Sequence, residues 1–576
     1  MVGATRFLAL SRFPWDWDEI LFCLAVRDYN MQAHQPHPPG FPLYVALAKL
    51  LRPFTSTDFA ALQIVNVIAA LAVFPVLFFL ARAFRLEFRS AYCAALLFSF
   101  LPNVWFYGGT AFSDLPAIVL FLASAAAFLA VGEHDTRRYL IASILLAAAL
   151  LIRPHSLLMA IYPWCAATVR LVRGKHLRSV IVSSVAVVVI VVIGYGAAAW
   201  VTGFDEFEQT LKMHSRFVGK TDTVYNPTRP QLPKIVRMQF DPYEAGKVSL
   251  LVNLLALIAL LFGSRRLAAE VLLTFLPFFV FMTFTLSHVG FSRLSLSYVA
   301  GIAILAAEGI GILARRVPRL DPLIRAAFVA LIAGRLITWT LPAFKEPRTT
   351  VPPPNAAAMW LHDHTNPKSK IFAHESMWPW ARYYLADRNW EHVGDDIGLH
   401  SENDVRDEWL LKAGPSHSLN SMQFRRPRQR LWNVVAQRYF EAFAQPVSDI
   451  VFFGTGWYQI EWTDELTWRW MGRRSTTMLP PLGGTCELRL RYSVPVDVLG
   501  RPVRVNFSLN GQPLGTRVST TYTDEVTFIA HARGNAPNVL RIEVGETIVP
   551  ARLKAGDDAR ELGLRLWAWG FRRIGD

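Results

Sequence analysis

The feature that most constrains the fold of this chain is a series of apolar segments between Phe59 and Leu341. Each is close to the roughly 20 residues that a helix needs to cross the hydrocarbon core of a bilayer. We place these segments at residues 59–81, 90–107, 112–131, 139–152, 155–172, 178–201, 248–263, 267–287, 293–314 and 321–341. The pattern predicts a polytopic α-helical membrane protein with about ten spans, embedded in a lipid bilayer.

The remainder of the chain has a different composition. Only 18% of all residues are charged, against about 25% in a typical soluble domain, and the deficit lies in the apolar half. After Leu341 the sequence becomes charged and mixed, beginning with the proline-rich stretch "FKEPRTTVPPPN". We therefore expect a membrane domain over residues 1–341 and soluble domains over 342–576.

The loops between the apolar segments indicate the orientation. One set reads "ARAFRLEFR", "GEHDTRR", "VRLVRGKHLR", "GSRR" and "RRVPRLDPLIR", and every member is basic. The alternate short loops, "WFYGGTAFSD", "RPH" and "SHVGFSR", carry two arginines between them. Because basic loops stay cytoplasmic, we expect loop one (11–58), loop 202–247 and the tail to lie outside, in the periplasm or extracellular space.

The same loops explain much of the formal net charge of +15, so no nucleic-acid partner is predicted. The four cysteines (Cys23, Cys93, Cys165 and Cys486) show neither a disulfide framework nor zinc-type spacing. The first residues, "MVGATRFLAL", are too short to span and lack a signal-peptide pattern. We interpret them as the last part of a truncated membrane helix.

Loop one holds the densest polar cluster of the membrane half. "DWDE" places Asp16, Asp18 and Glu19 within four residues. The cluster is either a solvated loop anchored by tryptophans at the interface or a set of catalytic carboxylates. Its D-x-D pattern could also hold a divalent cation.

The loop continues with "HQPHPPGFPLY", in which prolines and a glycine fix a turn before a helix. His34 and His37 lie in this turn, either as parts of a helix entry or as ligands of phosphate or sugar hydroxyls. No third metal ligand lies nearby in the sequence, so the pair alone does not predict a metal site.

Further polar residues lie at the outer ends of spans. Asp114 in "FSDLPAI" suits a helix N-cap. Arg153 in "LIRPHSL" either extends toward the interface or clamps a phosphate. With them lie His155, His288 and Arg293. All the candidate residues fall on the side predicted to be external, which predicts an external active site at the membrane surface.

The long loop 202–247 has helix-like apolar spacing at Phe204, Phe207 and Leu211, and more loosely at Phe217. This spacing predicts an interfacial amphipathic helix.

The tail reads as two regions. Over 342–450 we expect an α/β domain, with a helix and a strand in "NAAAMWLHDHTNPKSKIFAH" and a helix in "RQRLWNVVAQRYFEAF". Over 451–576, short alternating segments separated by turn residues predict a β-sandwich. Its aromatic residues could stack on sugars, but we favour a core role; they include Trp457, Tyr458, Trp462, Trp468 and Trp470.

Taken in order, "DE" in loop one, "HPPGFPLY", "FSDLPA", "RP" and a late external arginine resemble the GT-C superfamily. These are polytopic glycosyltransferases that use polyprenyl-phosphate-linked sugars, and the nearest branches are the protein O-mannosyltransferases and aminoarabinose transferases. "GWYQIEW" and the strands after it resemble the carbohydrate-binding-like sandwich of some bacterial members. Two departures are the missing first helix and Arg293-Leu294 in place of the usual "RY".

The resemblance implies an inverting transfer in which Asp18, with Glu19 and Asp16 beside it, takes the proton of an acceptor hydroxyl. Arg153, Arg293 and His37 would stabilise the leaving lipid phosphate. The implied partners are a polyprenyl-phosphate sugar donor and a glycan, lipid or protein acceptor, with no cofactor required beyond a possible divalent cation. The alternatives are a glycan-binding protein and a transporter. Transport is disfavoured because the middles of the spans hold almost no ionisable residues.

Overall fold

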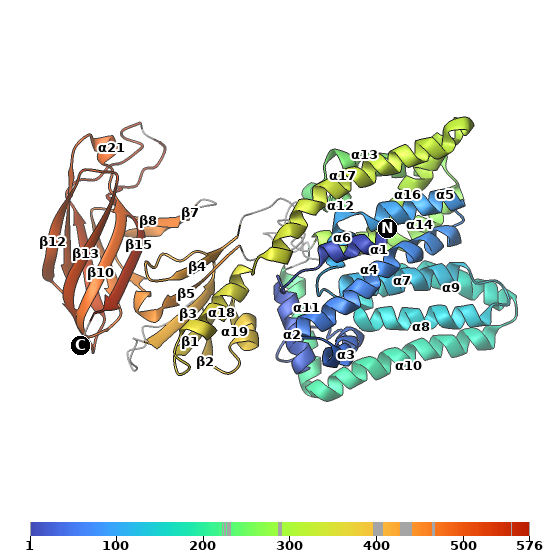
Figure 1. Ribbon diagram of the computed structural model, residues 1–576, viewed down its shortest axis with the longest axis horizontal. Coiled ribbons are helices and arrows are strands. Elements are labelled where there is room, and N and C mark those ends of the chain that lie inside the picture. Colours follow the sequence, from blue (N-terminus) through green and yellow to red (C-terminus); the bar gives the residue numbers. More distant parts are fainter. Residues whose placement is uncertain are drawn as a thin grey trace. The chain divides into compact units, whose positions relative to one another are not determined.

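The computed structural model of the chain describes residues 2–221, 223, 226, 232–285, 291–394, 407–426, 440–462, 467–554 and 556–574, with only the backbone of Phe291 and Trp462. The chain divides into two compact units between Val351 and Pro352. The described part of the first unit is helical, and that of the second consists mainly of strands (Figure 1).

The apolar segments correspond to helices of the first unit. These are α4 (Asp58–Ala83), α5 (Phe88–Ser99), α6 (Pro102–Tyr107), α7 (Asp114–Leu129), α8 (Thr136–Ile152), α9 (Leu157–Arg173), α10 (Leu177–Thr202), α13 (Lys247–Phe262), α14 (Arg265–Thr285), α16 (Leu296–Arg315) and α17 (Asp321–Thr349). Within the described residues, five stretches are long and apolar enough to cross a membrane: α4, α10, α14, α16 and Pro318–His364, which contains α17. The helices α7 and α13 are apolar but shorter. The predicted polytopic helical fold is confirmed.

The predicted span 90–107 is not one continuous helix. It breaks after α5, and Leu101 is extended before Pro102 begins α6. Proline has no amide hydrogen, so it suits the first position of a helix, where no intrahelical bond is lost, and Pro102 begins α6 there. All six residues of α6 are buried, and this short helix contacts α7, α15 (Phe291–Leu294) and α17.

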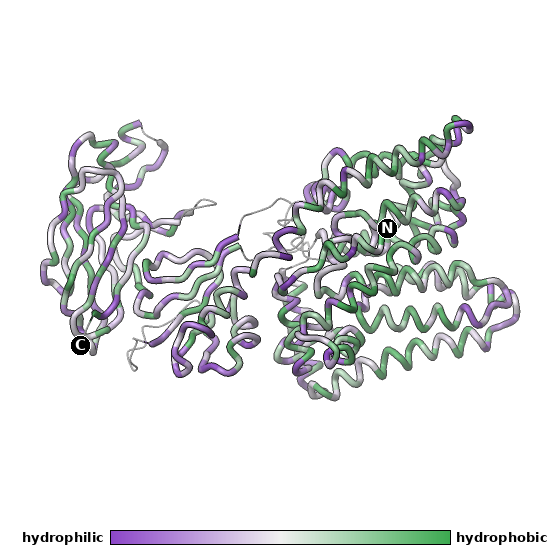
Figure 2. The backbone as a smooth tube through the Cα atoms, viewed as in Figure 1, coloured by the Kyte–Doolittle hydropathy of each residue, from purple (hydrophilic) through white to green (hydrophobic). Residues whose placement is uncertain are grey.

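The helical unit has two chemically different ends. The helix α7 runs from Asp114 to Leu129, and α8 returns from Thr136 to Ile152, just before Arg153. Asp114 and Arg153 therefore share one end, and the charged segment 133–138 lies at the other. Figure 2 shows hydrophobic residues along the helices and hydrophilic residues concentrated near their ends.

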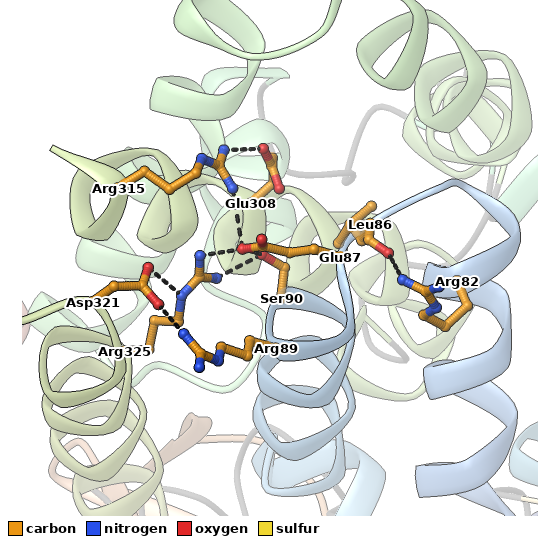
Figure 3. Close-up of polar contacts among 9 residues, drawn as sticks. All are labelled: Arg82, Leu86, Glu87, Arg89, Ser90, Glu308, Arg315, Asp321 and Arg325. Atoms are coloured by element: carbon orange, nitrogen blue, oxygen red, sulfur yellow. Dashed lines mark hydrogen bonds and ion pairs between the residues drawn. The ribbon is translucent and has the colours of Figure 1, made fainter. Parts of the chain in front are cut away.

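At the end opposite Asp114, ion pairs join α5, α16 and α17 (Figure 3). Arg325 donates hydrogen bonds to Asp321 (2.9 Å), Ser90 (2.7 Å) and Glu87. Arg89 binds Asp321 at 2.8 Å, and Arg315 binds Glu308 at 2.6 Å and Glu87 at 3.1 Å. We call these seven residues the Arg325 cluster. It fixes three helix ends that are far apart in the sequence.

Shorter helices complete the first unit. They are α1 (Val2–Arg6), α2 (Trp17–Arg27), α3 (Pro42–Leu51), α11 (Phe204–Thr221) and α12 (Leu232–Phe240). The helix predicted in the long loop is α11. Phe204 and Phe217 are exposed on it, and Thr210 is its buried residue. Exposed aromatic side chains on such a helix agree with the predicted interfacial location.

The second unit begins with a small α/β region. Its elements are α18 (Pro353–His364), β1 (Lys370–His374), α19 (Trp378–Tyr384), β2 (Asn389–Val393), β3 (Glu408–Ala413), β4 (Met422–Arg425) and β5 (Glu441–Pro446). The strand order is β2-β1-β3-β5-β4, with β1 parallel to β2 and β3, and β5 antiparallel to β3 and β4.

The helix predicted over residues 428–443 is wrong at its C-terminal end. Residues from Glu441 form β5, which pairs on both sides and buries Ala442, Phe443 and Ala444. A short apolar run that is buried on both faces does not distinguish a strand from a helix by its periodicity. Residues 428–439 of that prediction lie outside the described part of the chain.

The predicted β-sandwich is confirmed. One sheet has the order β13-β10-β15-β8-β7 and the other β12-β11-β14-β9-β6. The strands are β6 (Phe452–Phe453), β7 (Trp457–Trp462), β8 (Thr467–Met471), β9 (Arg474–Leu479), β10 (Gly484–Ser493), β11 (Val503–Leu509), β12 (Gln512–Ser519), β13 (Thr523–Ala532), β14 (Asn538–Val544) and β15 (Leu564–Arg573). Alternate residues such as Val503, Val505 and Phe507 are buried, as expected for strands with one face on the core.

The core interpretation of the sandwich aromatics is wrong for Trp468 and Trp470. Both are half-buried and lie on the face of β8 away from the buried Met471. Their rings flank the guanidinium of Arg565 at 5.3 and 5.2 Å. Trp457, by contrast, packs against the core. Sequence alternation gave the two faces of the strand but did not show which face points inward.

Candidate active site

The loop-one cluster begins with a helix cap. Asp16 is the N-cap of α2, and its carboxylate accepts a hydrogen bond from the backbone amide of Asp18 at 3.1 Å. Glu19 closes the same capping box from the third helical position. This D-x-x-E spacing satisfies amides that the first turn of a helix leaves open. Two of the three acids in "DWDE" therefore have a structural use.

Glu19 also joins loop one to the segment before α7. Its side chain is fully buried and accepts hydrogen bonds from the amides of Trp15 (2.6 Å), Asp16 (3.0 Å) and Ala111 (2.8 Å). Burial raises the pKa of the Glu19 carboxyl to about 7, although the amide donors act in the opposite direction. Glu19 thus holds two segments that carry charged residues of the site.

Asp18 makes the contact that brings distant parts of the chain together. Its Oδ2 accepts a hydrogen bond from Arg293 Nη1 at 2.6 Å, across 275 residues of sequence. Its Oδ1 lies 3.8 Å from His37 Nδ1. The Asp18 side chain is 13% exposed and that of Arg293 18%, so the pair is largely, but not fully, screened from solvent.

A second acid lies between the two arginines. Asp114 Oδ2 is 2.7 Å from Arg153 Nη2 and 3.6 Å from Arg293 Nε. Arg153 also donates to the Ser113 hydroxyl at 3.1 Å. Asp18, Arg293, Asp114 and Arg153 therefore form a chain of alternating charges. With His37 we call them the Asp18 cluster.

Aromatic rings form the walls around these charges. The guanidinium of Arg293 lies 4.9 Å from the centre of the Phe112 ring, and that of Arg153 lies 5.3 Å from the Phe41 ring. Such contacts attract a cation while they keep water away. Charged groups in a low-dielectric surrounding interact more strongly than they would in water.

His37 lies in the turn that the prolines predicted. Its ring packs against Phe22 and Phe41, with ring centres 5.5 and 4.8 Å away. Burial, assisted by the two nearby arginines, lowers the pKa of His37 to about 4, although Asp18 acts in the opposite direction. The imidazole is therefore neutral at ordinary pH, and its buried Nδ1 has no hydrogen-bond partner within the described residues.

Two predicted residues lie outside this cluster, and a third lies outside the described part of the chain. His34 is exposed and makes no hydrogen bond or ion pair with the cluster within the described residues. His155 packs against Phe278 with a ring-centre distance of 5.1 Å. The predicted role of His288 cannot be assigned a geometry, because residues 286–290 are outside the described ranges.

Asn103 contributes to the site but was not predicted. Its amide donates to the carbonyl of Ser292 at 3.0 Å and to the hydroxyl of Ser295 at 2.8 Å, and so fixes the backbone on both sides of Arg293. The signal in the sequence was a single amide in the apolar run "FLPNVWF", because a buried amide requires hydrogen-bond partners.

The D-x-D pattern does not fit a divalent cation in this geometry. Asp16 is turned into the helix cap, and Asp18 is bonded to Arg293. Both carboxylates are thus engaged within the protein. No group of three or more His, Cys, Asp or Glu side chains suited to a metal ion occurs among the described residues.

The apolar helices and the charged cluster at one end of the bundle define a multi-pass helical membrane protein. The chain belongs to the family described as "Domain of unknown function (DUF6311)", which matches residues 40–350. A search of curated proteins finds no match.

Three solved structures are similar to this chain at low sequence identity. ArnT from Cupriavidus metallidurans bound to undecaprenyl phosphate has 14% identity and a TM-score of 0.49, covering 69% of this chain and 85% of ArnT. The oligosaccharyltransferase of Archaeoglobus fulgidus has 9% identity and a TM-score of 0.44, covering 95% and 96%. The arabinofuranosyltransferase AftD from Mycobacteria has 9% identity and a TM-score of 0.43, covering 100% and 58%.

Proposed function

We propose that this protein is a membrane glycosyltransferase that moves a sugar from a polyprenyl-phosphate donor to an acceptor hydroxyl, with Asp18 as the general base. The observation that carries the proposal is the Asp18–Arg293 contact at 2.6 Å. It joins the carboxylate of loop one to a cation suited to a phosphate, at one end of a membrane-spanning bundle. A direct displacement requires the base and the anion site to flank the same anomeric carbon.

The two arginines supply the proposed phosphate site. A guanidinium presents a planar fork of donors that matches phosphate oxygens. Arg153 is held in place by Asp114 and Ser113. Arg293 has a buried Nε without a hydrogen-bond partner within the described residues. A phosphate at this position would supply the missing acceptor and, as the leaving group, would gain charge that the arginines stabilise.

The ion pair also suggests how the base is released. A carboxylate bonded to a guanidinium is a weak proton acceptor, because the cation stabilises its charged form. A donor phosphate that binds Arg293 competes with Asp18 for the same donors. Asp18 then becomes available to take the acceptor proton only when a donor is present, which protects the donor from reaction with water.

His37 has a different proposed part. Its low pKa keeps it neutral, so it does not supply a cation to the phosphate at ordinary pH. Its Nδ1 lies 3.8 Å from Asp18. A neutral imidazole at this distance can hydrogen-bond a sugar or acceptor hydroxyl and orient it toward the carboxylate. His37 is thus proposed as a binding residue.

The remaining parts of the proposal concern partners and orientation. The ArnT structure is described as bound to undecaprenyl phosphate, which supports a polyprenyl phosphate as the carrier. By the positive-inside rule, the basic segments at the other end of the bundle support an external location for the Asp18 cluster and the C-terminal domains. The acceptor is a hydroxyl of a glycan, lipid or protein reached from that side, and the transfer inverts the anomeric carbon.

The deciding experiment replaces Asp18 by Asn and measures transfer from a lipid-phosphate sugar. General-base catalysis contributes about 10²- to 10⁴-fold, so turnover should fall by that factor while binding of the lipid phosphate is retained. Asp28→Asn is the matched control, because Asp28 is exposed at the other end of α2. Full turnover in Asp18→Asn would refute the assignment of the base.

A further inference from the structure

A cavity lies far from the Asp18 cluster, at the end of the bundle that carries the basic segments. Its volume is about 670 Å³. It is lined by the last turns of α4 and α7 and the first turns of α8: Val76, Phe79, Arg82, Ala83, Ala123, Ala126, Ala127, Ala130, Asp135, Arg137, Arg138 and Ile141. Since α7 rises about 1.5 Å per residue over its 16 residues, the cavity is roughly 20 Å from Asp114.

The cavity exists because the middle helix has small side chains. The helix α7 contacts both α4 and α8. Ala123, Ala126, Ala127 and Ala130 recur at the three- and four-residue spacing of one helix face. Methyl groups do not fill the space between the flanking helices, so this face becomes the floor of a groove.

The walls of the groove face the hydrocarbon of the bilayer. Phe79 on α4 is 62% exposed and Ile141 on α8 is 47% exposed. Exposed apolar side chains on membrane-spanning helices contact lipid, because the bilayer is their solvent. An apolar chain of a lipid is therefore the molecule that this groove meets.

The mouth of the groove is basic. Arg82 donates to the carbonyl of Leu86, and Arg138 binds Asp135 at 3.2 Å and the carbonyl of Ala130 at 2.8 Å. Arg137 is exposed and makes no hydrogen bond or ion pair within the described residues. Three arginines against one aspartate leave an excess of positive charge where a lipid headgroup would lie, which favours an anionic one.

We propose that this groove is a binding site for an anionic phospholipid, with an acyl chain on the alanine floor of α7 and the headgroup phosphate at Arg137. The site belongs to the leaflet opposite the Asp18 cluster, so it is separate from the proposed donor site. Its occupant would fill the space between α4 and α8. This proposal does not depend on the proposed catalytic function.

The experiment is native mass spectrometry of the purified chain with phosphatidylglycerol and phosphatidylcholine as probes. The chain should retain one phosphatidylglycerol in preference to phosphatidylcholine. One arginine near a membrane surface contributes enough for about a fivefold change in affinity, so Arg137→Gln should weaken phosphatidylglycerol retention about fivefold and Arg137→Lys should restore it. Ala127→Leu, which fills the floor, should reduce retention of either lipid.

Two matched controls should leave retention unchanged. Arg173→Gln removes an exposed arginine at the same end of the bundle, and Ala197→Leu enlarges an exposed alanine on α10. Equal retention of the two lipids, or unchanged retention in Arg137→Gln or Ala127→Leu, would overturn the proposal. Either result would show that the retained molecule is a non-specific annular lipid. A dimer that forms through this face in place of lipid would also overturn the proposal.

Discussion

The two ends of the helical unit carry ion clusters of similar composition but different completeness. In the Arg325 cluster, Arg325 has three partners. Within the described residues, each buried side-chain polar atom of this cluster has a hydrogen-bond partner. In the Asp18 cluster, the buried atoms Arg293 Nε and His37 Nδ1 have no hydrogen-bond partner within the described residues. Buried polar groups are nearly always hydrogen-bonded. The difference supports the proposal that the second cluster binds a ligand through these two atoms, whereas the first is satisfied by its own side chains.

The largest effect expected from this comparison is on stability. Arg325→Met should destabilise the protein by about 3–5 kcal/mol, because it breaks the buried ion pair with Asp321 and removes the hydrogen bonds to Ser90 and Glu87. Thermal unfolding in detergent measures the change. Arg335→Met, at an exposed position of the same helix, serves as the control and should have little effect. Equal stability of the two variants would contradict a structural role for the Arg325 cluster.

The next effect should be on transfer. Arg293→Met removes a proposed phosphate donor and should lower turnover about 10²- to 10³-fold, the range seen when one donor to a developing anion is lost. It should cost less stability than Arg325→Met, since Arg293 lacks a complete set of partners. Arg293→Lys keeps the charge and should recover part of the activity. If Arg293→Met lowers the stability of the protein as much as Arg325→Met does, both clusters have a structural role and the proposed difference between them is wrong.

A smaller effect is expected at the joint between loop one and α7. Glu19→Ala leaves three backbone amides without their acceptor, each worth about 0.5–1.5 kcal/mol, and should lower the unfolding temperature and the turnover together. The control Asp28→Asn acts on the exposed end of the same helix. A loss of turnover with an unchanged unfolding temperature would instead give Glu19 a direct part in the reaction.

The smallest effect concerns pH. The pKa of His37 is lowered to about 4 in the folded protein, below the value of about 6.5 of an unfolded histidine. Its contribution to stability is therefore present above pH 6.5 and is lost as the pH falls toward 4. The unfolding temperature of the native protein should fall more steeply over this window than that of His37→Gln. Parallel curves would show that His37 is not held neutral.

The sequence predicted features that depend on neighbouring residues. The apolar segments became helices because about 20 apolar residues in a row satisfy both the bilayer and the backbone. The sandwich strands followed from their alternation of polar and apolar residues. The GT-C resemblance further directed attention to Asp18, His37, Asp114, Arg153 and Arg293.

Other features escaped the sequence because they depend on packing between distant segments. Burial between β3 and β4, rather than local propensity, makes residues 441–446 a strand. Whether Trp468 faces the core depends on how two sheets pack. Asn103 became visible as part of the site only when its hydrogen bonds to the segment around Arg293 were known.

The sequence by itself determined that this is a multi-pass membrane protein and which residues lie at each end of its helices. Charge distribution between loops and helix length suffice for that, because a span is a local structure. The tertiary structure decided that Asp18, of the three neighbouring acids, meets Arg293, while Asp16 caps α2 and Glu19 binds backbone amides of loop one and of Ala111. That choice depends on side chains 275 residues apart, whose contact is fixed by helix packing.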